Sequence, residues 1–166
     1  MTTKQHSLEF RPAELEDAPA LTAWLMDPEI LRWFPMIDQR EVEDAVRIWV
    51  SFSRIGAGLS VLCDGVLCGM ANLYIQPYEK LKHTCLFSII LDKEYRSKGI
   101  GAALLRELMK LAKEKFHIEI LHLEVYQGNP AKKLYERLGF KEFGRQPYFI
   151  KENGKYMQKV FMQKSL

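Results

Sequence analysis

The segment from Arg96 to Gly101, RSKGIG, combines two basic side chains with two glycines at the mouth of a predicted helix. Backbone N–H groups in the first turn of a helix have no partner within the helix and lie at the positive end of its dipole, so they suit a phosphate. Glycine allows the phosphate to approach the backbone closely. The segment therefore predicts a phosphate or pyrophosphate site. A tight strand-to-helix turn without a ligand is the alternative.

A strand and a helix must hold this turn in place. Residues 84–91 form an apolar run with the composition of a buried strand. From Ala102 onward the period becomes helical, and the apolar stripe consists of Leu104, Leu105, Leu108, Leu111 and Ala112. Other phosphate motifs fit less well, because the chain has no Gly-Lys-Ser/Thr triplet here and no third glycine at dinucleotide spacing.

A second motif, LYERLGF, runs from Leu134 to Phe140. The strand, the R-x-x-G-x-G turn, the leucine-striped helix and this motif together resemble the GNAT superfamily of N-acetyltransferases. In that family the acetyl-CoA-binding segment reads Gln or Arg, two residues, Gly, one residue, Gly or Ala. The resemblance covers roughly residues 8–163. Residues 27–35 and 154–162 also resemble the ribosomal-protein N-terminal acetyltransferases and their small-molecule-modifying relatives.

The resemblance implies a single GNAT domain over residues 1–166, with an α/β (α+β) acyl-CoA N-acyltransferase fold. Its central sheet would be mixed and mostly antiparallel, with helices on both faces. The elements predicted from the residues follow the family's order of β, α, α, β, β, β, α, β, α, β, β. They are a strand at 8–11, a helix around 21–25, a helix at 40–54, strands at 59–63, 66–75 and 84–91, a helix from 102, a strand at 118–126, a helix after 130, and strands near 142–150 and 155–163.

The resemblance also implies where acetyl-CoA binds. In this family the strand before the phosphate turn splays from its neighbour, and its free backbone groups hold the pantetheine arm and polarise the thioester carbonyl. An asparagine contacts the cofactor too, and here it stands six residues before the tyrosine rather than the more usual seven. The cofactor-binding residues implied are Ile89, Ile90, Leu91, Arg96, Ser97, Lys98, Gly99, Ile100, Gly101, Ala102 and Asn129.

Tyr135 and Glu124 are the candidate catalytic residues. Tyr135 resembles the tyrosine that many family members place near the sulfur as general acid, because a phenol with a pKa near ~10 can protonate a thiolate whose thiol has a pKa near ~8.5. The alternative role is a packed aromatic. Some members carry a glutamate where Cys85 stands, so Glu124, in a Leu-Glu-Val context, is the candidate base. His122 on the same predicted face, a solvent base and a plain exposed charge are the alternatives.

Composition and charge limit the kinds of binding partner that we expect. The 24 basic and 21 acidic residues give a net charge of +3, too small to indicate a nucleic-acid partner. No apolar run reaches the length of a membrane span, and the polar opening does not read as a signal peptide, so we expect a cytoplasmic protein. Cys63, Cys68 and Cys85 read as reduced, buried thiols without a metal. Whether the chain forms a homodimer is left open by the sequence.

The first hypothesis is an acetyl-CoA-dependent N-acetyltransferase acting on a primary amine of a small molecule or a protein N-terminus. Trp33, Phe34 and Met36 either roof the core or line the acceptor pocket. The second hypothesis is a non-catalytic acyl-CoA-binding regulatory module, favoured by Cys85 at the glutamate position. A Rossmann-type nucleotide fold is a third, and the predicted antiparallel hairpins argue against it.

Overall fold

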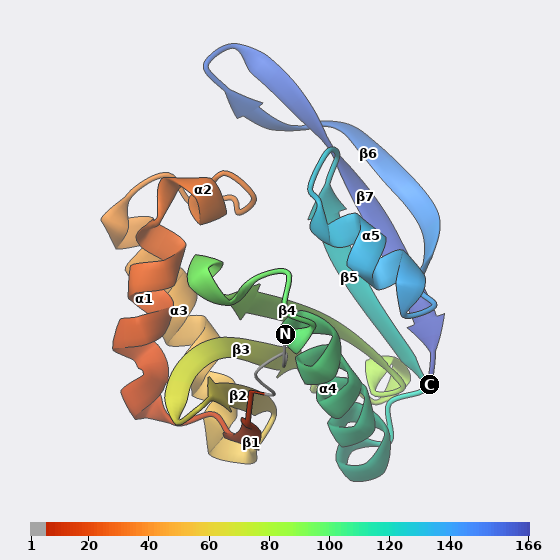
Figure 1. Cartoon of the computed structure of the whole chain (residues 1–166). Coiled ribbons are helices and arrows are strands. Elements are labelled where there is room, and N and C mark those ends of the chain that lie inside the picture. The colour runs from red at the N-terminus through yellow and green to blue at the C-terminus, as the bar shows by residue number, and fades with distance from the viewer. Residues whose placement is uncertain (1–5) are drawn as a thin grey trace, which may run out of the picture.

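The computed structural model describes residues 6–166, and its strands form one seven-stranded sheet in the order β1-β2-β3-β4-β5-β7-β6 (Figure 1). The strands are β1 (Leu8–Pro12), β2 (Gly58–Cys63), β3 (Val66–Tyr74), β4 (Thr84–Leu91), β5 (Ile120–Tyr126), β6 (Lys141–Glu152) and β7 (Lys155–Ser165). The helices are α1 (Ala18–Met26), α2 (Pro28–Leu31), α3 (Gln39–Ser51), α4 (Ile100–Phe116) and α5 (Ala131–Arg137). Short 3₁₀ segments lie at Leu15–Asp17, Phe52–Ile55, Glu79–Leu81 and Lys93–Tyr95.

The sheet is mixed and mostly antiparallel, as predicted. Strands β1 to β4 pair antiparallel in chain order, and β5, β7 and β6 form a second antiparallel group. Among the described strands, the one parallel pairing joins β4 to β5 at the centre. Figure 1 shows the end of the β6–β7 hairpin extending beyond the other elements of the fold.

Helices cover both faces of the sheet. Leu104, Leu105 and Leu108 of α4 are fully buried in a core that also contains Tyr135 and Phe140 from the α5 region. Helices α1 and α3 build a second core on the opposite face, against Met70 and Ile90. This arrangement explains the helical apolar stripes in the sequence, since each stripe lies against one face of the same sheet.

The two predicted hairpin turns are present. Asp64 and Gly65 join β2 to β3 with φ values of 50° and 81°, and Asn153 and Gly154 join β6 to β7 with φ values of 48° and 74°. Consecutive residues with positive φ give the twist that antiparallel strands need, which is why these residue pairs favour hairpins. The three cysteines are free and buried, as predicted. In the described part of the chain, no helix is both long enough and apolar enough to span a membrane.

Candidate active site

The central strands β4 and β5 separate along their length. Their pairing runs from Thr84 opposite Ile120 to Leu86 opposite His122 and ends there. Beyond that point β4 continues to pair with β3 as far as Leu91. The edge of β4 that faces β5 is therefore open from residue 87 onward, and a cavity of about 500 Å³ lies at this opening.

Three groups of residues line the cavity. The first comes from β4 and the turn that follows it, the second from β5, α5, β6 and β7, and the third from the α2 region. They include Ile89, Ile90, Leu91, Arg96, Ser97, Gly99, Gly101, Ala102, Glu124, Asn129 and Tyr135 among the candidates from the sequence. Candidate residues that lie up to 46 positions apart in the chain, from Ile89 to Tyr135, are thus brought to one cavity.

The turn before α4 leaves the helix start free for an anion. Asp92 Oδ1 accepts a hydrogen bond from Glu94 N and so begins the 3₁₀ segment that leads into the turn. Gly99 is the N-cap residue of α4 with φ 78°, and no side chain caps the helix there. The first N–H groups of a 17-residue helix are therefore available for a ligand in the cavity.

Gly99 and Gly101 serve different purposes in this turn. A Cβ on Gly99 would meet nothing within 4 Å, so the positive φ, rather than packing, is what calls for glycine. A Cβ on Gly101 would lie 3.3 Å from Leu91 Cδ1 and 3.4 Å from Leu134 Cδ2. Gly101 therefore allows α4 to pack closely against β4 and α5.

Two residues of the motif point elsewhere. Lys98 does not line the cavity, and its Nζ lies 5.2 Å from the centroid of the Tyr95 ring. Ile100 is 2% exposed and belongs to the core beneath α4. The helix begins at Ile100, two residues before the start predicted from the leucine stripe. The sequence motif therefore mixes residues that face the cavity with residues that anchor it.

Tyr135 lies on α5 with its ring in an aromatic cluster. Its ring centroid is 6.0 Å from that of Phe87 and 6.2 Å from that of Phe140, both in edge-to-face arrangements. Burial raises the pKa of Tyr135 well above that of a free phenol. The hydroxyl therefore stays protonated over the physiological pH range and is available as a donor in the cavity that the residue lines.

Glu124 lines the cavity and forms an ion pair. Its Oε2 accepts a hydrogen bond of 2.7 Å from Lys159 Nζ. The Glu124 side chain is 39% exposed, whereas that of Lys159 is 9% exposed. The sequence analysis did not single out Lys159, although a lysine next to the apolar pair Val160 and Phe161 in a strand could have signalled a buried charge.

The other candidate acid–base groups are arranged differently. His122 pairs with Leu86 where β4 and β5 are still joined, and it does not line the cavity. Burial lowers the pKa of His122. Cys85 is fully buried, and burial raises its pKa to about 12, so the thiol is not ionised near neutral pH. Asn129 lines the cavity, and its Oδ1 accepts a hydrogen bond of 3.0 Å from Ala131 N at the start of α5.

The aromatic segment after α1 forms one wall of the cavity. It contains the short helix α2, which the sequence patterns did not predict, because Asp27 caps only four helical residues. Trp33 and Phe34 line the cavity, whereas Met36 packs against the core of α1 and α3. Trp33 Cη2 lies 4.0 Å from where a Cβ on Gly128 would be, so the indole reaches across to the loop between β5 and α5.

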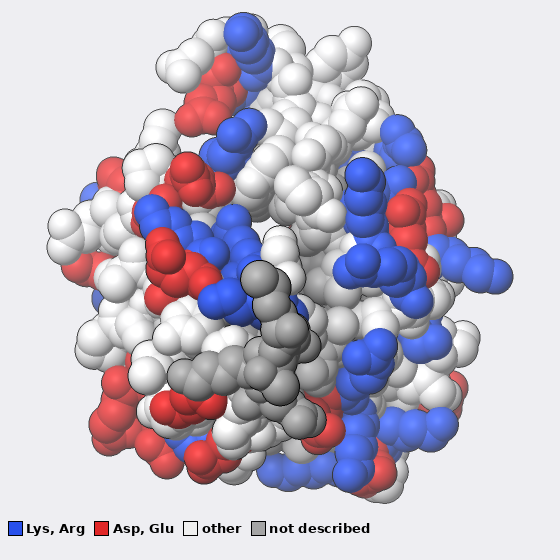
Figure 2. All heavy atoms as spheres, in the orientation of Figure 1, with Lys and Arg blue, Asp and Glu red and all other residues white. Residues whose placement is uncertain are grey.

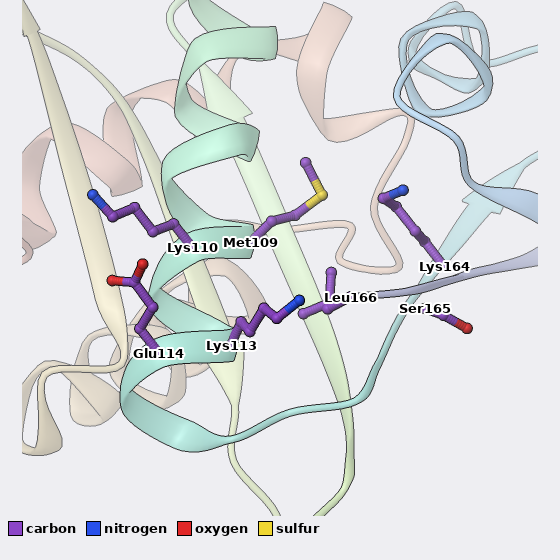
Figure 3. Close-up of a pocket in the computed structure, with 7 residues that line it drawn as sticks. All are labelled: Met109, Lys110, Lys113, Glu114, Lys164, Ser165 and Leu166. Carbon is purple, nitrogen blue, oxygen red and sulfur yellow. The ribbon is translucent and has the colours of Figure 1, made fainter.

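A second recess lies away from the opened strands, between α4 and the end of β7 (Figure 3). Figure 3 shows Lys113 and Leu166 pointing toward each other, while Lys110 and Glu114 point to the other side of the helix. No candidate site residue lines this recess. It therefore has no part in the arrangement described above.

One group of potential metal ligands occurs in residues 6–166. His6, Cys63 and Asp64 place one donor atom each within 4.8 Å of one another at the β2–β3 turn. His6 Nδ1 lies 2.7 Å from Asp64 Oδ2. None of the three lines the cavity. The expectation that the protein uses no metal stays a prediction.

Basic side chains gather on the face that carries the phosphate turn. Figure 2 shows Lys and Arg over α4 and α5, with some acidic side chains beside them. Positive potential on such a face raises the local concentration of a polyanionic ligand.

A family model decides the relationship of the chain to known proteins. The model described as the acetyltransferase (GNAT) family matches residues 16–140. The chain belongs to the GNAT family of acetyltransferases. The matched residues include the open edge of β4, the phosphate turn, Glu124 and Tyr135, which are the parts of the GNAT chain that meet at the cavity.

Individual relatives agree with this family. The L-amino acid N-acetyltransferase AaaT of Escherichia coli (strain K12) is 28% identical over 111 residues, which are 66% of this GNAT chain and 68% of AaaT. A ribosomal-protein-alanine N-acetyltransferase of Brucella melitensis has a similar structure, with a TM-score of 0.77, 27% identity, and coverage of 95% of this chain and 99% of that one.

Further similarities vary in extent. An acetyltransferase of Salmonella typhimurium, solved with its cofactor acetyl-CoA, gives a TM-score of 0.79 at 20% identity over 95% of this chain and 93% of that one, and so shares the fold. Several other curated relatives match the chain over about half of their own length.

Proposed function

We propose that this GNAT protein transfers the acetyl group of acetyl-CoA to a primary amine by direct attack in a ternary complex. The observation that carries the proposal is the cavity at the opening of β4 and β5, because the phosphate turn, Tyr135 and Glu124 all line it. The acceptor is an amine of a small molecule or of a protein N-terminus. Both classes occur among the relatives, as amino acid and as ribosomal-protein alanine acetyltransferases.

The cofactor lies along the β4 edge in this proposal. The N–H groups at the start of α4 and the Arg96 guanidinium bind the pyrophosphate, since both favour anions. The backbone of residues 89–91 orients the pantetheine arm, and Asn129 lies at the other wall. Lys98 and Ile100 contribute through the backbone of the turn, because their side chains do not line the cavity.

The chemistry needs one bond to form and one to break. The neutral amine attacks the thioester carbonyl, a C–N bond forms, and the C–S bond breaks. A backbone N–H at the open edge of β4 stabilises the oxyanion that develops on the carbonyl oxygen. The proton lost by the amine is balanced by the proton that the departing thiolate gains. The products are an N-acetyl amine and free CoA thiol.

Tyr135 supplies the donor for the departing sulfur. Because burial raises the pKa of Tyr135, complete proton transfer to the thiolate is less favourable than for a free phenol. Tyr135 therefore stabilises the departing thiolate by hydrogen bonding in the transition state. The thiolate then takes its proton from solvent, and Glu124 returns the amine proton to solvent, so the protons balance.

Glu124 receives the proton of the acceptor. Its Oε2 is held by Lys159, and no described residue hydrogen-bonds to Oε1. A carboxylate oxygen in the cavity suits both tasks that an ammonium substrate presents, which are binding the cation and taking its proton.

The experiment is a screen of amines, amino acids and N-terminal peptides with acetyl-CoA, read by release of CoA thiol and by a product mass gain of one acetyl group. The proposal predicts acetylation of at least one amine class. The alternative, a non-catalytic acyl-CoA-binding module, is favoured by Cys85 at the position where some members carry a glutamate. It predicts tight acetyl-CoA binding without thiol release for any amine.

A further inference from the structure

Lys159 is an unusual lysine, because its ammonium group is buried at the wall of a cavity. Lys159 as a whole is 7% exposed, and it lines the cavity together with Glu124. Its Nζ donates to Glu124 Oε2 at 2.7 Å and lies 3.4 Å from the centroid of the Phe149 ring. An ammonium group has three N–H donors. The centroid of the Phe161 ring lies farther away, 5.6 Å from Nζ. Nζ has one hydrogen-bonded oxygen among its described partners, so it keeps donor capacity for a ligand.

The backbone of β6 is distorted where it supplies this aromatic face. The register between β6 and β7 shifts between Gln146 and Ile150, and Tyr148 within the shift has φ 56°, an uncommon value for a residue other than glycine. Phe149 lies in this bulge and lines the cavity. Bulges redirect side chains and are frequent beside active sites. The strand is therefore built to place Phe149 against the Lys159 ammonium.

The other cations of the cavity lie on the cofactor side. Arg96 belongs to the phosphate turn and Arg137 to the end of α5. Lys159 instead lies on β7, directly opposite Tyr126 of β5 in the strand register. A second negative group that enters the cavity beside the acceptor amine would therefore meet Lys159.

We propose that the Glu124–Lys159 pair recognises the zwitterionic head group of a free α-amino acid and that Lys159 determines acceptor specificity. This inference rests on the proposed function. The amine of the acceptor lies at Glu124 Oε1, and its carboxylate accepts a hydrogen bond from Lys159 Nζ. The ammonium and carboxylate groups of the ligand, which share one α-carbon, then face two opposite charges that the protein holds 2.7 Å apart.

The pair distinguishes the two acceptor classes by the group next to the amine. A protein N-terminus carries a neutral amide where a free amino acid carries a carboxylate. Binding the amide would leave the buried Lys159 without an added anionic partner, and a site built for a charged group discriminates strongly against a ligand that lacks it. Free amino acids are therefore the preferred acceptors.

The first test needs no variant. The kcat/KM of the full chain with acetyl-CoA is measured for the standard amino acids and for the matching amino acid amides and dipeptides. Ionisation by itself favours the amides, because their amines have the lower pKa and are more often neutral. We expect the best amino acid to exceed its amide by roughly tenfold or more, as charge-assisted recognition requires.

The second test uses Lys159→Met, which keeps an unbranched side chain and removes the charge. Loss of the ion pair with Glu124 affects both acceptors alike, so the informative quantity is the ratio of kcat/KM for the amino acid to kcat/KM for its amide. This ratio should fall by roughly 10-fold to 100-fold in the variant. Lys159→Arg should restore part of the preference. Lys164→Met on the same strand is the matched control, because Lys164 lines the separate recess of Figure 3. Acetyl-CoA affinity, measured by calorimetry, reports whether each variant is folded.

The outcomes separate this inference from the proposed function. Equal or faster acetylation of amides or dipeptides by the unmodified chain overturns the role of the pair while the acetyltransferase proposal stands. A parallel loss for amino acids and amides in Lys159→Met shows a structural role and also overturns it. Lack of acetylation with every amine, at intact acetyl-CoA binding, overturns the proposed function and this inference together.

Discussion

Two tyrosines line the cavity among the described residues, and their surroundings differ. Burial raises the pKa of Tyr126 to about 12, with a smaller contribution from the Glu124 carboxylate, and burial alone raises that of Tyr135. Tyr126 faces the Phe149 ring on the acceptor side, whereas Tyr135 packs against Phe87 of β4. Only Tyr135 therefore adjoins the strand along which we propose that the thioester lies.

Tyr135→Phe tests this assignment at the residue scale. The ring contacts with Phe87 and Phe140 remain, so acetyl-CoA affinity should stay within about twofold by calorimetry, while kcat falls by about 100-fold because the donor to the sulfur is lost. Tyr156→Phe, at an exposed position of β7, should change neither quantity. A variant with unchanged kcat would mean that Tyr135 serves packing alone.

Glu124→Gln tests the proposed base. The rise of kcat with pH reports the loss of a proton from the base in the ternary complex, so it should flatten in the variant, and kcat should fall by about 100-fold. His122→Gln is the control, because His122 does not line the cavity, and its profile should match that of the unmodified chain. If the profile of Glu124→Gln keeps its shape, a solvent base takes the proton.

Sequence patterns identified site residues whose role follows from a local motif and missed those that depend on tertiary contacts. The motif from Arg96 to Gly101 needs only a turn and a helix start, so consecutive residues reveal it. Lys159 and Phe149 meet across two strands through a bulge, and no spacing within one segment encodes that contact. The ion pair of Glu124 was hidden for the same reason.

At the scale of elements, the amphipathic stripes and the turn pairs Asp64-Gly65 and Asn153-Gly154 correctly predicted the main helices and hairpins. The prediction placed the start of α4 at Ala102, because the helical period becomes visible from there, whereas the helix starts at Ile100. Helix α2 was missed because four residues between Asp27 and Arg32 are too few to show a period.

The phosphate turn allows a matched test of one element. Gly99→Val places a β-branched side chain at φ 78° and beside the proposed pyrophosphate, so acetyl-CoA affinity should fall by roughly tenfold or more by calorimetry. Gly65→Val is the control, since Gly65 has φ 81° and equally open space but lies in the β2–β3 turn. Both should lose about 1–2 kcal/mol of stability.

The comparison between the two glycine variants isolates the anion site from general strain. Similar losses of thermal stability with a loss of acetyl-CoA affinity in Gly99→Val alone would support the site. Unchanged affinity in Gly99→Val would contradict it, because a bulky residue at that point would then not meet the cofactor.

At the scale of the molecule, the splay between β4 and β5 divides the sheet into two antiparallel groups, and the site lies between them. The family resemblance implied this opening, whereas composition and periodicity did not. A strand has the same hydrophobic pattern whether the edge that faces its neighbour is hydrogen-bonded or open. The active site thus depends on how well each group of strands holds its own shape. In the first group, a buried carboxylate joins the edge strand to the helices.

Asp17 is that carboxylate, and it links β1, β2 and the start of α1. It is 4% exposed and accepts hydrogen bonds from Arg11 Nη1 and Nη2 at 2.8 and 2.7 Å and from Ser60 Oγ at 2.7 Å. Burial favours a higher pKa for Asp17, but the hydrogen bonds from Arg11, from the backbone of Glu14 and from Ser60 lower it below the usual value. The ionised form is therefore the one that stabilises the fold.

The sign of the pH dependence follows from this lowered pKa. The stabilisation is fully present above the pKa of an unfolded aspartate, near ~3.9, and is lost as the pH falls through the lower pKa of the folded state. Asp17→Asn should reduce the free energy of unfolding by about 2 kcal/mol at pH 7, measured with urea. Between pH 6 and pH 3 it should lose less further stability than the unmodified chain.

The control is Glu79→Gln, which removes a carboxylate from the exposed pair with Lys82 and should change the free energy of unfolding by less than about 0.5 kcal/mol. Equal acid sensitivity of Asp17→Asn and the unmodified chain would mean that other carboxylates set the acid limit and that the Arg11–Asp17 pair does not hold the first group of strands to α1.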